Sequence, residues 1–197
     1  MGSVSPWAGE TFGDAAERLT ALVPASLARA HARARDGQAG VHTQTLEAYG
    51  HGLYAAQYEE LAVGLADLPD TVPVRLQGRT LMIVRNQVVY PYRYAKKDVP
   101  VTAARLRRAV GFRADLIRRH GPEPRQQAFD LGLDEPAEPD AHPDLRLLPA
   151  EVGLVLVAYA CSMAEGVLRV EWGSAELRTE DRYLAWHHHE PLSPSGR

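Results

Sequence analysis

The chain has 197 residues, of which 45% are hydrophobic and 24% are charged, and its formal net charge is −3. This length suffices for one substantial core and argues against two full domains, so we predict a single domain over 1–197. The longest nearly apolar run, 152–164, is shorter than the roughly 20 residues that cross a bilayer, which excludes a membrane-spanning segment.

The only cysteine, Cys161, cannot form an internal disulfide, and no apolar leader opens the sequence. Both features favour a cytoplasmic protein. The richness in alanine, arginine and proline is typical of proteins from GC-rich bacterial genomes.

The charge is divided into three blocks. Residues 1–74 hold 4 Lys/Arg and 9 Asp/Glu, residues 75–125 hold 13 and 3, and residues 126–197 hold 5 and 13. The blocks therefore carry charges of −5, +10 and −8. The central block either faces an anionic partner or is neutralised by the acidic flanks, and the sequence leaves both alternatives open.

The first third of the chain has helical character. A capping-box spacing that starts at Asp14 predicts a helix from there, and Pro24 is expected to end or kink it. An Ala/Arg helix over 25–36 follows and is expected to stop at Gly37. Residues 1–10 are predicted to be a flexible terminus.

A longer helix is predicted over 43–68, where apolar residues recur at spacings of three and four. Over 72–94 the pattern changes to β-branched and aromatic residues, with turn candidates at 77–78 and 86–87, which predicts two or three antiparallel strands. Pro91 argues for an edge position or a bulge, because proline cannot donate to a ladder.

Another helix is predicted over 100–120, since Pro100 precedes it and Gly121 closes it. A helical wheel places Arg113 inside its apolar arc, where a buried carboxylate partner or a contact surface is expected. The opposite, exposed face carries Arg107, Arg108, Arg118 and Arg119. Residues 121–149 are predicted to form an acidic, proline-rich surface loop.

The C-terminal part returns to strand character at 152–160, 167–172 and 183–188, and 193–197 should be a flexible end. The fold class is therefore α+β, with an antiparallel or mixed sheet and an N-terminal helical segment. The sheet comprises the two groups of strands 72–94 and 152–188 and packs against helices 43–68 and 100–120.

The basic block is the strongest functional signal. On one helix, its two arginine pairs would lie about 16 Å apart, and Tyr90, Tyr92 and Tyr94 would form one aromatic strand face. These features predict a non-enzymatic protein that binds nucleic acid or another polyanion through 79–119. The predicted binding residues are Arg93, Lys96, Lys97, Arg107, Arg108, Arg118, Arg119 and Tyr92. Alternatively, the arginines are solvated or pair with the acidic residues of 130–144, and the tyrosines are sheet core.

A run of three histidines suggests a second site. On a regular strand, His187 and His189 point to one face, which suits two ligands of one divalent metal ion. A third ligand would come from His142, Glu171 or the Glu59-Glu60 pair. This hypothesis implies a metal-dependent enzyme; otherwise no cofactor is expected, and the histidines form an exposed polar strand end.

A third interpretation is a protein-interaction module. The alternating charge blocks suit association of the basic block with an acidic protein surface, and we expect a homo-oligomer. No nucleophile motif is present: residue 167 is Val rather than the Arg of a phosphatase loop, and Ser174 lacks the second Gly of a hydrolase elbow. Cys161 is therefore predicted to be a buried strand residue, and whether the chain is an enzyme stays open.

Overall fold

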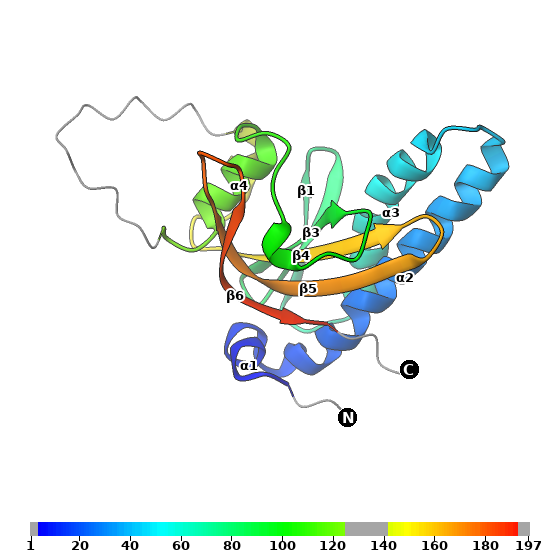
Figure 1. Ribbon diagram of the computed structural model, residues 1–197. Coiled ribbons are helices and arrows are strands. Elements are labelled where there is room, and N and C mark those ends of the chain that lie inside the picture. The colour runs from blue at the N-terminus through cyan, green and yellow to red at the C-terminus, as the bar shows by residue number, and fades with distance from the viewer. Residues whose placement is uncertain (1–3, 125–141, 193–197) are drawn as a thin grey trace.

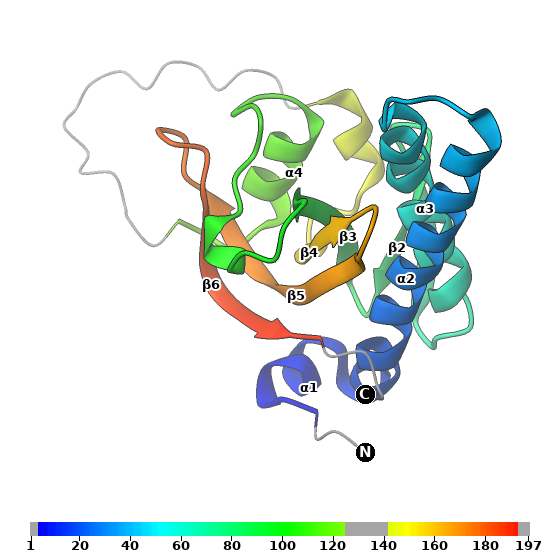
Figure 2. The same ribbon diagram turned by 45° about the vertical axis from the view of Figure 1, so that its right-hand side comes forward.

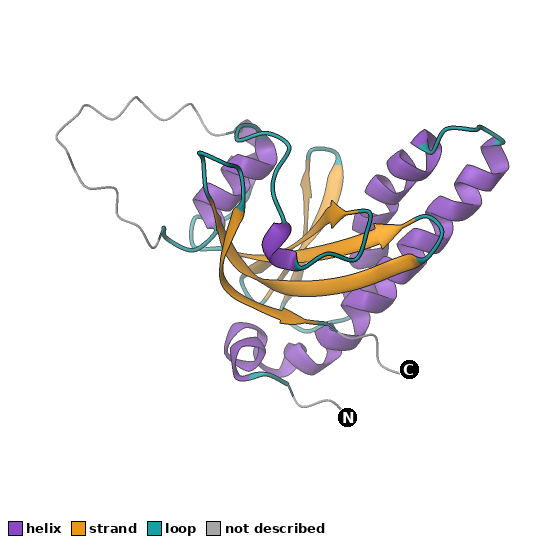
Figure 3. Cartoon of the chain, in the orientation of Figure 1, coloured by secondary structure: helices purple, strands orange, loops and turns teal. Residues whose placement is uncertain are grey.

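A six-stranded mixed sheet with helices against it forms the centre of the molecule (Figures 1 and 3). The computed structural model describes residues 4–124 and 142–192. Figure 2 shows α4 on one side of the sheet and α2 with α3 on the other. The predicted α+β class is confirmed.

Residues 6–10 belong to a helix, which corrects the expectation of a flexible terminus for that part of 1–10; residues 1–3 lie outside the described residues. Helix α1 (Pro6–Phe12) begins with Pro6 at its first position, and the Ser5 hydroxyl accepts a hydrogen bond from the Ala8 amide at 3.0 Å. Trp7 and Phe12 pack their rings on Trp172 at 5.8 and 5.1 Å. These aromatic contacts hold a helix that is too short to be stable by itself.

Helix α2 (Ala16–Val41) is one continuous helix of 26 residues, preceded by a 3₁₀ turn, η1 (Gly13–Ala15). The predicted end of a helix at Pro24 and the predicted stop at Gly37 are both wrong. A buried row of side chains along α2 packs against the adjacent helix: Leu19, Val23, Leu27, Ala30 and Ala34. This tertiary contact outweighs the local preference of proline and glycine to end a helix.

Helix α3 (Glu47–Leu65) lies antiparallel to α2 and is shorter than the predicted 43–68. The Gln38 side chain explains its start. The Gln38 amide nitrogen donates to the carbonyls of Thr43 and Thr45, and its oxygen accepts from the Tyr49 amide at 2.8 Å. One buried amide therefore holds the connection in a non-helical conformation and caps the next helix.

The strands run in chain order across the sheet, β1 to β6, and every neighbouring pair is antiparallel except β3 and β4. Both predicted groups of strands are confirmed. The first hairpin turns at 77–78 as expected, but the second turns at Arg85-Asn86, one residue early. The strands are β1 (Thr71–Leu76), β2 (Arg79–Val84), β3 (Gln87–Ala95), β4 (Gly153–Ser162), β5 (Gly166–Leu177) and β6 (Leu184–Pro191).

Pro91 lies in β3 where only β4 runs beside the strand. The β2–β3 ladder ends at the pair Met82 and Val89, whereas the β3–β4 ladder continues past Pro91. The residue therefore has a local edge position, as its missing amide hydrogen requires.

The predicted helix over 100–120 is wrong in its first half. Only η2 (Val101–Ala103) and α4 (Phe112–His120) are helical. Between them the chain runs along the start of β6: the Leu106 amide donates to the Arg182 carbonyl at 2.9 Å, and the Leu184 amide donates to the Ala104 carbonyl at 3.0 Å. These inter-segment bonds replace the helical ones, and Gly111, at a φ of 97°, starts α4.

The predicted surface loop 121–149 is described only at its two ends. Residues 142–149 include η3 (Pro143–Leu147), which packs Leu145 into the core beside Leu148. This end of the segment is therefore partly buried rather than an open loop. The predicted flexible end 193–197 lies outside the described residues.

Two hydrophobic clusters cover the two faces of the sheet. One combines α1, α2 and α3 with Tyr159 and Trp172, and the other combines α4, the segment 104–106 and η3 with Leu156 and the β1–β2 hairpin. Both faces of the central strands are therefore buried. Within 4–124 and 142–192, no helix has both the length and the apolar character that crossing a membrane requires.

Leu53 and Val63 of α3 provide a test of this packing. Leu53 is 1% exposed and Val63 is 73% exposed. Leu53→Ala should lower the free energy of unfolding in urea by about 2–5 kcal/mol, because it leaves a cavity between α2 and α3. Val63→Ala should change it by less than about 0.5 kcal/mol. Equal effects of the two substitutions would contradict the assignment of the buried face.

Candidate functional site

The ion pairs of the described residues show which carboxylates balance the positive charge of the basic block, residues 75–125. The N-terminal arginines pair within their own block, Arg29 with Glu60 and Arg33 with Glu59 and Glu60, each at 2.8 Å. In the C-terminal block Arg178 pairs with Asp181. The acidic flanks are therefore partly occupied by their own arginines.

No lysine or arginine of 75–124 forms an ion pair with a flanking acid within the described chain. Among the described residues, one ion pair lies inside the block and joins Arg118 to Asp115 at 3.5 Å. One further pair between described residues leaves the block and joins Asp98 to Arg169, where the block supplies the acid. Asp144, the described acid of 130–144, binds Gln77 instead, and those hydrogen bonds lower the pKa of its carboxyl.

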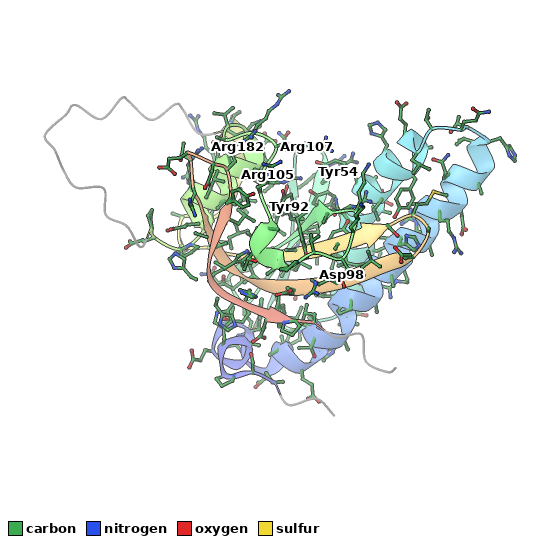
Figure 4. The ribbon with its side chains drawn as sticks, in the orientation of Figure 1. Tyr54, Tyr92, Asp98, Arg105, Arg107 and Arg182 are labelled. Carbon is green, nitrogen blue, oxygen red and sulfur yellow. The ribbon has the colours of Figure 1, made fainter. Side chains whose placement is uncertain are left out.

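Six exposed arginines line the segment before α4, the end of α4 and the β5–β6 turn. We call them the arginine surface: Arg105, Arg107, Arg108, Arg118, Arg119 and Arg182. The Arg182 guanidinium donates to the Arg107 carbonyl at 2.8 Å, and that of Arg118 donates to the Ala109 carbonyl at 2.7 Å. Figure 4 shows Arg105, Arg107 and Arg182 close together above the sheet.

The arginine surface is assembled differently from the predicted helix face. Arg107 and Arg108 project from extended chain, whereas Arg118 and Arg119 project from α4. Sequence reasoning missed Arg105 and Arg182, because Arg182 belongs to the acidic C-terminal block and joins the others only through the bridge between Arg105 and Tyr183. No local sequence pattern predicts that bridge.

Two of the tyrosines predicted to stack on bases lie under the arginines. Tyr90 and Tyr92 are 2% and 5% exposed, so neither ring is available to a base. The Tyr92 hydroxyl donates to the Arg105 carbonyl, and burial raises the pKa of this phenol. The inclusion of Tyr92 among the binding residues is therefore corrected: the ring is sheet core and supports the segment that carries Arg105.

Arg113 rests on these rings rather than on a carboxylate. Its guanidinium carbon lies 4.8 Å from the Tyr92 ring centre and 5.7 Å from that of Tyr90, and its Nε donates to the Tyr90 hydroxyl at 3.1 Å. Within the described chain no acid pairs with it. The cation is held by ring faces, an arrangement that stabilises without removing the positive charge.

The other predicted basic residues lie elsewhere. Arg93 donates from Nε to the Cys161 carbonyl at 3.0 Å and lies over the Tyr49 ring at 5.6 Å, so it holds the end of β4. Lys96 and Lys97 are exposed just beyond β3. Figure 4 places the following residue, Asp98, apart from the three labelled arginines.

Cys161 belongs to a buried polar cluster. The Tyr49 hydroxyl lies 3.3 Å from the Cys161 sulfur and 3.0 Å from His31 Nδ1. Burial raises the pKa of the thiol, and burial together with Arg35 and Arg93 lowers the pKa of His31. At neutral pH the pair is therefore an uncharged thiol and an uncharged imidazole, which confirms Cys161 as a buried strand residue without nucleophilic activation.

The histidine run is interrupted by a β-bulge. Ser174 pairs with His188 but Ala175 pairs with Trp186, so His187 is the extra residue. The bulge reverses the alternation: His188 stacks on Trp7 at 4.4 Å on the face of α1, and His189 packs on Trp186 at 5.8 Å on the opposite face.

The prediction that His187 and His189 share a metal ion is therefore wrong, because the bulge puts them on opposite faces. Each contacts its own carboxylate: His187 Nε2 lies 3.2 Å from Glu176, and His189 Nδ1 lies 2.8 Å from Glu171. The other proposed ligands also have partners, His142 with Gln77 and Glu59-Glu60 with arginines. Across the described residues, no group of three His, Cys, Asp or Glu side chains is arranged to hold a metal ion.

Comparison of the chain with protein-family models, curated proteins and solved structures yields no match. The arginine surface is consequently judged by its own geometry.

The buried state of Cys161 has a direct chemical consequence. In native protein, a thiol reagent such as a chromogenic disulfide should label Cys161 at least about tenfold more slowly than in protein unfolded in urea. The sequence contains one cysteine, so the absorbance reports this thiol alone. Equal rates in the two states would show that the cluster opens readily and would contradict its buried, uncharged character.

His120 predicts a pH dependence of stability. It is 4% exposed, and because a carbonyl only accepts, its Nδ1 must donate the 2.7 Å bond to Val152; burial lowers its pKa. Between its native pKa and 6.5, the unfolded chain binds more protons, so stability falls as pH falls through this range. The loss should reach about 1.4 kcal/mol per pH unit for each such histidine.

Denaturation at several pH values between 7.5 and 5 measures this slope. His120→Gln should flatten it, and His51→Gln, at an exposed position of α3, should leave it unchanged. A slope that His120→Gln does not alter would show that the imidazole is not neutral in the native state.

Proposed function

We propose that the protein binds a polyanion, in the first instance the phosphate backbone of nucleic acid, through the arginine surface. The observation that carries this proposal is that carboxylates of the described residues do not balance the positive charge of the arginine surface. Of the six arginines, all but Arg118 have no carboxylate partner within the described residues. Such a concentration of like charge destabilises the free protein and favours an anionic partner.

The arginines are partly pre-positioned for such a partner. Arg105 lies over the Tyr183 ring at 5.9 Å, and Arg182 and Arg118 are tied to backbone carbonyls. A guanidinium held in this way loses less side-chain entropy when it binds phosphate in a bidentate manner. The surface therefore suits phosphate groups better than a set of freely rotating lysines would.

The buried tyrosines determine the expected mode of recognition. Since Tyr90 and Tyr92 are covered, base stacking is not available to them, and contacts to phosphate dominate. Contacts of this kind give binding that depends strongly on salt and weakly on base sequence. We accordingly expect similar affinity for DNA or RNA of unrelated sequences.

Two earlier expectations accompany this proposal. A cytoplasmic location fits a nucleic-acid partner, and Lys96 and Lys97 would form a separate, secondary contact. Self-association through the acidic surfaces of a second copy would compete for the same basic residues. Light scattering of the free protein is therefore part of the test. A dimer that dissociates when nucleic acid is added would show that the acidic surface of a second copy occupies the arginine surface in the free protein.

Charge reversal at Arg107 and Arg108 tests the proposal. Both side chains are exposed and make no ion pair within the described chain, so stability should change by less than about 0.5 kcal/mol for each. Fluorescence anisotropy with labelled DNA or RNA at about 50 mM salt should show binding by the unmodified protein. Arg107→Glu with Arg108→Glu should weaken it and lower the slope of log affinity against log salt by about two.

A control with the same change in net charge is Arg35→Glu with Arg75→Glu, on α2 and β1, away from the arginine surface. This variant should retain most of the affinity and the salt slope. Failure of the unmodified protein to bind any nucleic acid at about 50 mM salt would overturn the proposal, and equal losses in both variants would reduce it to an effect of net charge.

A further inference from the structure

A cavity of about 480 Å³ lies between α1, the β2–β3 turn and the strands β4 and β5. This volume falls within the roughly 300–1,000 Å³ of small-molecule sites. It lies by α1, whereas Figures 1 and 4 place the arginine surface by α4 and the β5–β6 turn, across the sheet. Its lining residues are Trp7, Glu10, Thr11, Arg85, Gln87, Leu154, Val155 and Ser174.

The cavity arises where two strands separate. The β4–β5 ladder ends at the pair Leu156 and Gly173, so Leu154, Val155 and Ser174 lie beyond the last paired residues. Helix α1 lines one side of this space, which is open to solvent, and Trp7 holds the helix there: its ring stacks on His188 at 4.4 Å and contacts Trp172 at 5.8 Å. The space therefore has an apolar floor from β4 and an aromatic wall from α1.

The polar side chains around this floor have no partners among the described residues. The carboxylate of Glu10, the hydroxyls of Thr11 and Ser174, the guanidinium of Arg85 and the amide of Gln87 form no hydrogen bond or ion pair with any described residue. They come from α1, the β2–β3 turn, β3 and β5, and all five are at least partly open to solvent. A ligand can therefore reach several polar groups that converge on one pocket, as in small-molecule sites.

The backbone holds Arg85 in an unfavourable conformation. Its φ of 45° lies in the left-handed region, which favours Gly or Asn in a two-residue hairpin turn. Its guanidinium rests on Gly13, where a Cβ would come within 2.6 Å of Nη1. Turn preference does not explain an arginine at this position, and its side chain lines the cavity.

Gln87 is held in a similar way. Its side-chain amide lies over Gly153, where a Cβ would come within 2.3 Å of Oε1. Gly13 therefore leaves space for the Arg85 side chain, and Gly153 leaves space for that of Gln87.

We propose that this cavity binds a small zwitterionic ligand, with Arg85 receiving a carboxylate and Glu10 an amine. Arg85 and Glu10 line the same space but are not paired with each other, since no ion pair joins them within 4.0 Å. A ligand with both charges is attracted by both residues, whereas a simple anion would be attracted by Arg85 and repelled by Glu10. Free amino acids and dipeptides share this chemistry.

Thermal unfolding of the full chain with added ligand tests the proposal. The probes are the free L-amino acids and glycylglycine, each at about 10 mM or, for tyrosine, at its solubility limit. The intrinsic tryptophan emission, to which Trp7 contributes, is a second readout for the probes that do not fluoresce themselves. At least one probe should raise the melting temperature by about 2 °C or more and change the tryptophan emission. A response to amino acids alone or to glycylglycine alone would identify which source of the zwitterion fits.

Two variants and two chemical controls define the charge requirement. Arg85→Gln and Glu10→Gln should each weaken binding of the active probe by about ten- to a hundredfold, because each removes one charged hydrogen-bond partner. Arg75→Gln and Glu17→Gln, exposed residues outside the cavity, should leave it unchanged. The N-acetylated and esterified forms of the active probe should not bind.

Three outcomes would overturn the proposal. The first is the absence of any response among the probes. The second is a response that survives both Glu10→Gln and N-acetylation of the probe, which would show a simple anion site. The third is a response that survives Arg85→Gln. Because Arg85 and Glu10 lie outside the arginine surface, their variants should leave nucleic-acid binding intact, which separates a failure here from a failure of the proposed function.

Discussion

The parallel pairing of β3 with β4 is the contact on which the arrangement of this molecule depends. Parallel neighbours cannot be joined by a tight turn, so the chain between residues 95 and 153 must cross over one face of the sheet. That crossover contains the segment 104–106, α4 and η3, which bury the second face against Leu156 and the β1–β2 hairpin. It also contains many of the basic residues, so the position of the arginine surface follows from the strand order.

The crossover buries aromatic rings and at the same time exposes positive charge. Tyr90 and Tyr92 fill the space beneath the crossover, and Arg113 covers their faces. Strand β3 supplies the buried layer of rings, and the segments that follow it in the chain supply the charged layer above them. The same tyrosines that resemble a stacking platform in the sequence thereby support the arginine surface.

The two proposed sites use opposite principles of charge. The arginine surface collects like charges at the rim of the crossover, where only a partner of opposite sign relieves the repulsion. The cavity beside α1 has one positive and one negative side chain that do not pair with each other, and the ligand proposed for it carries both signs. Their separation across the sheet allows each to be changed without altering the other.

The α+β class, both groups of strands, the turn at 77–78 and the local edge at Pro91 were predictable, because strand periodicity and turn chemistry act over a few residues. The tertiary structure decided what local periodicity cannot represent. Hydrogen bonds from Leu106 to Arg182 keep 104–111 out of a helix, and one extra residue in β6 turns His189 to the face opposite His187. The ordered α1 depends on Trp172, far away in the chain. Block charges indicated a basic surface, but only the folded chain determined that its arginines lack acidic partners among the described residues, since pairing depends on which side chains lie within a few ångströms.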